Sequence, residues 1–102
     1  MSEYLKNIKV SVKKSLMIPS DDLESDTELT IHINSCFSLI RSAGVSDALI
    51  SSGNGLVEAL VLIYCKTFYG FTNDGSVKEL PSSFDLLLRQ LVLTQEVWFY
   101  VS

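Results

Sequence analysis

The apolar stretch Leu56-Val-Glu-Ala-Leu60-Val-Leu-Ile-Tyr-Cys65-Lys-Thr-Phe-Tyr69 decides the fold of this 102-residue chain. On a helix, its apolar side chains would lie almost all round the axis, and such a helix is usually buried on most sides. The stretch is shorter than the roughly 20 residues that a membrane-spanning helix needs. The sequence therefore predicts a central helix over residues 56–69, packed between other helices, and no contact with a membrane.

Two helices are predicted on the N-terminal side of this stretch. An apolar stripe with spacings of three and four predicts the first over residues 4–16, and Pro19 prevents its continuation. Ser25 and Glu28 have the spacing of a capping box, in which each side chain satisfies a free backbone N–H group. They predict a second helix over residues 26–43, which the following glycine would end.

The C-terminal third is predicted to contain a last helix, opened by Pro81-Ser82. The turn signal Asn73-Asp-Gly75 leaves residues 71–79 as either a bare loop or a short hairpin. Residues 46–50 leave a further short helix open. The final residues are aromatic and β-branched, which favours an extended tail over residues 94–102.

The fold class that follows is all-α. We expect a small bundle of four to five helices in a single domain over residues 1–102, with its core in residues 4–93.

Composition and charge exclude several classes of function. Twelve acidic and eight basic residues give a net charge of −4, which argues against wrapping nucleic acid as the main role. Two cysteines and no visible secretory leader argue against a disulfide scaffold and for an intracellular chain. Cys36 and Cys65 are expected to be reduced and buried, with a disulfide between them as the alternative.

No motif in the sequence marks a catalytic or metal-binding site. His32 is the single histidine, and no second histidine or cysteine follows it at metal-ligand spacing. The acids of residues 21–28 lack the central glycine of an EF-hand calcium loop, and the glycine-rich segment 52–55 lacks the lysine of a P-loop. We therefore expect no cofactor, no metal and no enzymatic activity. A hydrolase in which His32 activates a serine or cysteine is the enzymatic alternative.

Charge is divided between two neighbouring segments. Residues 1–20 carry four lysines against one glutamate, or +3, and residues 21–28 carry five acids and no base, or −5. A head-to-tail interface between copies needs two different, complementary patches. The lysine stripe could therefore meet the acidic run of a neighbouring copy. The candidate residues are Lys6, Lys9, Lys13, Asp21, Asp22 and Glu24.

The predicted helices also carry more apolar surface than so small a domain can bury, and surplus of this kind usually marks an association surface. On the outward faces of the third and last helices, the candidate interface residues are Leu62, Cys65, Leu86 and Leu93. The tail adds Trp98, Phe99 and Tyr100, and tryptophan and tyrosine are favoured at interfaces. The tail would either fold back on its own core or bind a partner.

The order of several motifs resembles that of a known family. The motifs are Val12-Lys-Lys-Ser-Leu16, the spaced Asp22 and Asp26, Ile40-Arg-Ser-Ala-Gly44, Phe68-Tyr-Gly70 and Leu80-Pro81. Their order and spacing resemble the tailed-phage head–tail connector family, often labelled DNA-packaging protein, and the resemblance covers roughly residues 5–93.

This resemblance implies an α-helical structural adaptor without catalytic residues. Such an adaptor would form a ring of identical copies in the virion neck, assembled in the host cytoplasm. Its partners would be the portal protein and a downstream connector or tail protein. DNA would pass through the ring without sequence-specific binding, and a net negative charge suits such a conduit because it repels phosphates. The alternative is a small dimeric helical module that binds or regulates another protein.

Overall fold

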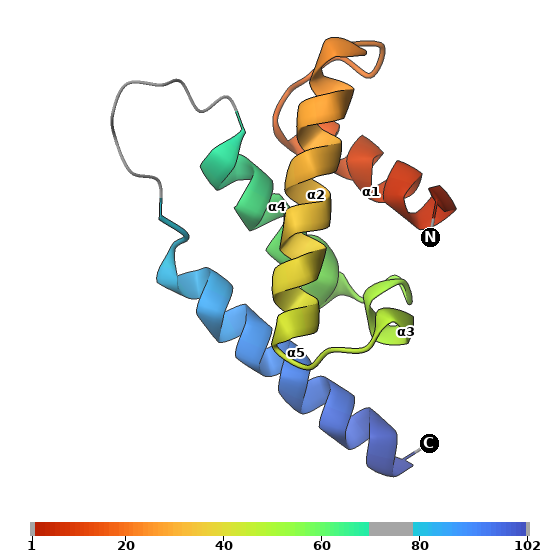
Figure 1. The fold of residues 1–102 in the computed structure, drawn as a ribbon, viewed down its shortest axis with the longest axis vertical. Helices are drawn as coiled ribbons and strands as arrows, with labels where there is room; N and C mark the ends of the chain where they lie inside the picture. The colour runs from red at the N-terminus through yellow and green to blue at the C-terminus, as the bar shows by residue number, and fades with distance from the viewer. Residues whose placement is uncertain (1, 70–78, 102) are drawn as a thin grey trace.

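The computed structural model describes residues 2–69 and 79–101, with side chains for 3–69 and 79–95 (Figure 1). The described residues form five helices, which are α1 (Ser2–Ser15), α2 (Glu24–Ser42), α3 (Asp47–Ile50), α4 (Gly55–Phe68) and α5 (Ser82–Val101). No strand occurs among these residues, and the all-α prediction is confirmed. The alternatives of loop or hairpin at 71–79 concern residues that, apart from Glu79, lie outside the described ones.

Helix α4 forms the centre of the bundle, as its apolar sequence predicts. It packs against α1, α2 and α5. Val57, Leu60 and Val61 are fully buried, and full burial of one such side chain contributes about 1.5–3 kcal/mol. α2 supplies the largest share of the remaining core, through Leu29, Ile33, Cys36, Phe37 and Ile40. α4 is therefore buried only when other helices cover it on several sides.

The C-terminal end of α2 confirms the role of Gly44. This glycine has φ +99°, a left-handed conformation that side chains with a Cβ atom rarely adopt. The N–H of Gly44 donates to Arg41 O at 2.9 Å, and the N–H of Val45 donates to Ile40 O at 3.4 Å. These two bonds form the Schellman motif that commonly closes a helix.

The N-terminal end of α2 differs from the predicted capping box. The helix begins at Glu24, two residues before the predicted start, with Leu23 at the N-cap and no side-chain cap there. The Asp22 carboxylate accepts the N–H of Glu24 at 3.1 Å, and the Ser25 hydroxyl donates to Asp22 O at 3.0 Å. The capping-box prediction is wrong because the loop turns back earlier and brings Asp22 over the first turn.

The loop between α2 and α3 is fastened to α5 by one side chain. Gln95 accepts the N–H of Ser46 at 2.6 Å and donates to Gly44 O at 2.8 Å. α3 itself is capped by the Ser46 hydroxyl, which accepts the N–H of Leu49 at 3.3 Å. The open alternative of a short helix at 46–50 is thereby resolved in favour of a helix.

The predicted extended tail is not observed. The backbone of α5 continues in helical form to Val101. The described part of the chain contains no strand with which extended residues could pair, so their N–H and C=O groups would be left to water. Continuing an existing helix adds one hydrogen bond for each residue fixed, so the helix outweighs the β-propensity of residues 97–101.

Two isoleucines of α2 test which face of this helix holds the bundle together. Ile33→Ala should lower the free energy of unfolding by about 2–5 kcal/mol, because Ile33 is fully buried. Ile31→Ala removes the same atoms from a side chain that is 58% exposed, and it should change stability by less than about 0.5 kcal/mol. Urea unfolding followed by circular dichroism measures both. Equal losses in the two variants would contradict the observed packing.

Candidate functional site

His32 lies at the edge of the core and has a partner on its own helix. Its Nε2 atom is 3.1 Å from Glu28 Oε2, one helical turn earlier. Its ring centroid lies 6.3 Å from that of Tyr64 and 6.4 Å from that of Phe68. In the described residues, no three histidine, cysteine or acidic side chains come together to hold a metal ion. These contacts support a packing role for His32.

Cys36 and Cys65 are free thiols in the core. Burial raises the pKa of each thiol to about 12. A thiol of this kind is almost wholly protonated near neutral pH, and the thiolate is the reactive form. The prediction of two reduced, buried cysteines is confirmed, and the alternative disulfide does not form in this structure.

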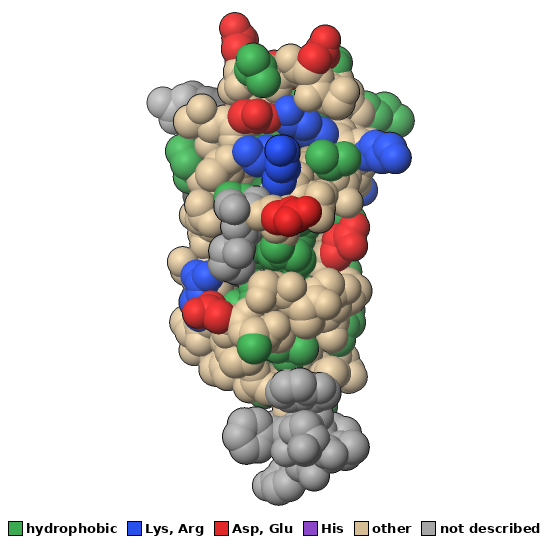
Figure 2. All heavy atoms as spheres, turned by 90° about the vertical axis from the view of Figure 1, so that its right-hand side faces the viewer, with side chains coloured by type: hydrophobic (Ala, Val, Ile, Leu, Met, Phe, Trp, Pro, Cys, Tyr) green, Lys and Arg blue, Asp and Glu red, His purple; other side chains and the backbone are tan. Residues whose placement is uncertain are grey.

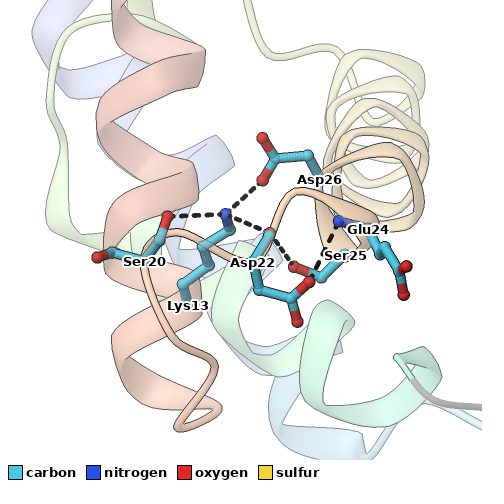
Figure 3. A network of polar contacts seen from close by, with 6 residues as sticks. All are labelled: Lys13, Ser20, Asp22, Glu24, Ser25 and Asp26. Atoms are coloured by element: carbon cyan, nitrogen blue, oxygen red, sulfur yellow. Dashed lines mark hydrogen bonds and ion pairs between the residues drawn. The ribbon is translucent and has the colours of Figure 1, made fainter.

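The main polar cluster of the structure lies between α1 and the start of α2 (Figure 3). Lys13 and Ser25 are the two buried polar residues of the described chain, and both bind the same carbonyl group. Lys13 Nζ donates to Asp22 O at 3.0 Å and to Ser20 O at 3.4 Å. It also forms an ion pair with Asp26. This cluster, called here the Lys13 network, ties the loop 16–23 to α1.

A helix-capping turn fixes the same loop at the C-terminal end of α1. Met17 has φ +61°. Its N–H donates to Lys14 O at 3.2 Å, and the N–H of Ile18 donates to Lys13 O at 2.9 Å. This is a Schellman motif with methionine at the position where glycine is usual, so no glycine in the sequence marks it. The turn aims the loop back over α1.

The Lys13 network corrects one part of the predicted interface. Lys13 was expected to meet the acidic run of a neighbouring copy, together with Lys6 and Lys9. Instead it is only 6% exposed and pairs with Asp26 of its own chain. The reason is the tight turn after α1, which brings the acidic segment beside the last turns of this helix.

The other lysines of α1 border a groove of about 530 Å³ beside this network. Lys6 and Lys14 are exposed and Lys9 is half-buried. Val10 and Ile18 supply apolar surface to the same groove. Figure 2 shows basic side chains gathered in the upper half of this face, with acidic ones directly above and below them. Of the predicted acidic residues, Asp21 and Glu24 are exposed and Asp22 is half-buried.

The predicted apolar interface separates into exposed and buried members. Leu86 and Leu93 of α5 are 61% and 53% exposed. Leu62 is half-buried and packs against the core. Cys65 has no exposed surface, because α4 is covered on that side too. Its place in the predicted interface is therefore corrected: it is a core residue. The side chains of Trp98, Phe99 and Tyr100 lie outside the described ones.

Leu93 also borders a groove of about 440 Å³ between α5 and the C-terminal end of α2. Ala43, Leu88 and Val92 line it, so its surface is largely apolar. The Asp85 carboxylate and the Arg89 guanidinium form an ion pair at 3.0 Å on its border. An apolar groove with a charged border has the chemistry of a surface that binds protein.

Substitution of Lys13 tests whether the network holds the loop. Lys13→Met keeps the aliphatic stem but leaves the Ser20 carbonyl and the Asp26 carboxylate without this donor. It leaves the Asp22 carbonyl with Ser25 as its remaining donor. It should lower the free energy of unfolding by about 1–3 kcal/mol. Lys14→Met, at the exposed neighbouring position, should change it by less than about 0.5 kcal/mol. Urea unfolding of both variants measures these free energies. If Lys13→Met were as stable as the wild type, the network would not have this structural role.

The Asp26 carboxyl should make the free energy of unfolding depend on pH in the acidic range. The hydrogen bond from Lys13 is the main cause that lowers its pKa below the ordinary 3.8. A carboxyl with a lowered folded-state pKa stabilises the fold fully above its unfolded pKa, and it loses this contribution as pH falls through the folded value. The stability of the wild type relative to Asp26→Asn should therefore be constant near neutral pH and shrink below about pH 4. Thermal unfolding between pH 7 and pH 2 measures the difference, and a constant difference would refute the ion pair.

No helix of the described residues is long and apolar enough to cross a membrane. Searches of curated proteins and of solved structures gave no significant match. The sequence model of one family, described as phage connector protein, matches residues 8–97, a range that runs from α1 into α5. This match confirms the predicted family resemblance. The chain belongs to the phage connector protein family.

Proposed function

We propose that this connector is a structural adaptor that forms a ring of identical copies between the portal and the tail, in the neck of the virion. The phage connector family is generally structural rather than enzymatic, which supports such a role. In the proposed ring, DNA passes through the centre without sequence-specific contacts. The net charge of −4 supports this role because it disfavours adhesion of the phosphate backbone.

The observation that carries the proposal is the exposed apolar face of α5. Leu86 and Leu93 lie seven residues apart and therefore on one side of the helix. Leu93 borders the apolar groove that reaches Ala43 of α2. A monomer gains nothing from holding leucines in water, whereas a neighbouring copy or the portal would bury them. We place the contact between the connector and its neighbours in the assembly on this face.

Substitutions on α5 test this assignment. Leu86→Glu and Leu93→Glu together should abolish co-assembly with the portal protein of the same phage, because they bring charge into an apolar contact. The fold should remain, since both side chains are exposed. Light scattering and negative-stain electron microscopy of the mixture measure ring formation, and circular dichroism checks the fold.

Ile31→Glu is the matched control. Ile31 is as exposed as the two leucines but lies in the N-terminal half of α2, twelve residues from Ala43. This variant should assemble like the wild type. If the α5 double variant also assembles like the wild type, the α5 face is not the assembly surface. If the wild type forms no complex with the portal, the adaptor role is wrong.

A further inference from the structure

The α1–α2 corner carries an exposed apolar surface that the α5 face does not explain. This corner consists of the exposed side of α1, from Lys6 to Lys14, and the loop 16–23 with Glu24. Met17 is 92% exposed and Leu23 is 75% exposed, the two highest values among the large hydrophobic side chains described. Isolated exposed apolar residues are common, but these two lie in one short loop.

Backbone contacts at both ends of the loop hold it in one conformation, in which Met17 and Leu23 point into solvent. In the Lys13 network, the Lys13 ammonium group donates hydrogen bonds to the carbonyl groups of Ser20 and Asp22. The left-handed turn at Met17 fixes the other end of the loop. A loop that is ordered before binding loses less conformational entropy when a partner covers it.

The chemistry of the loop matches the groove beside it. The loop presents Met17 and Leu23 next to the exposed acids Asp21 and Glu24. The groove presents apolar surface from Val10 between lysines, of which Lys6 and Lys14 are exposed. An acidic, apolar loop and a basic, apolar groove are complementary in both charge and hydrophobicity.

The positions of these two surfaces determine how copies could meet. A head-to-tail ring needs the two complementary patches on well-separated flanks of each subunit. Here Ile18 and Ser20 of the loop themselves line the groove, so loop and groove share one corner. Adjacent patches of opposite character form a self-complementary surface, which two copies can satisfy together about a two-fold axis. Nucleic acid fits less well, because carboxylates border the lysines.

We propose that two copies of this chain pair through their α1–α2 corners, with the loop of each copy seated in the lysine-bordered groove of the other. This pairing leaves the α5 face free, since the corner and the α5 groove lie at opposite ends of α2 (Figure 1). The pairing does not rest on the proposed ring.

Charge reversal on each half of the corner tests the pairing. The groove variant carries Lys6→Glu and Lys14→Glu, and the loop variant carries Asp21→Lys and Glu24→Lys. The wild type should be a dimer by sedimentation across a concentration series. Each variant alone should self-associate about tenfold or more weakly, because two surfaces of equal sign then face each other. A one-to-one mixture should regain the dimer, since each groove then meets a loop of opposite charge.

Three results would overturn the pairing. They are a monomeric wild type at all concentrations, a dimer that neither variant weakens, and a mixture that does not regain the dimer although both variants keep the wild-type helical signal. The α5 variant Leu86→Glu, Leu93→Glu should still dimerise. Loss of the dimer in that variant alone would move the contact between copies to α5, and would leave the proposed adaptor role standing.

Discussion

The burial of α4 is the constraint on which the rest of the fold depends. Its apolar residues occupy several sides, and Val57, Leu60, Val61 and Cys65 have no exposed surface. One covering helix cannot achieve this, because a helix contacts a neighbour along a single stripe. α1, α2 and α5 therefore have to surround α4, and their connections must return the chain across it each time. The Gln95 side chain ties one of these connections, between α2 and α3, to α5.

A second constraint is the desolvated charge of Lys13. An ammonium group is costly to remove from water unless its donors find acceptors. Here two carbonyl groups and the Asp26 carboxylate provide them. The same acceptors belong to the loop 16–23 and the start of α2, so satisfying one charge also fixes a turn. The energy of the network thereby stabilises the shape of the surface above it.

The two exposed surfaces of the molecule suit different contacts. The α5 face is apolar and lies beside a groove, which fits a neighbour with an apolar surface of its own. The α1–α2 corner combines apolar and charged groups of both signs, which fits a second copy. The two surfaces lie at opposite ends of α2, so covering one leaves the other accessible (Figure 1). Membership of the phage connector family implies contact with other phage head or tail proteins, and both surfaces are open to such contacts.

The sequence by itself determined the helices and the central place of α4, because apolar periodicity and helix-ending residues act locally. Gly44 ends α2 as predicted, and the outward position of Leu86 and Leu93 follows from helical spacing alone. The family resemblance also depended on the order of motifs along the chain. Only the tertiary structure decided the partners of Lys13 and the burial of Cys65, since both depend on which segments lie together in space. The capping box failed for the same reason: local spacing does not reveal that the helix begins two residues earlier, where the loop brings Asp22 over the first turn.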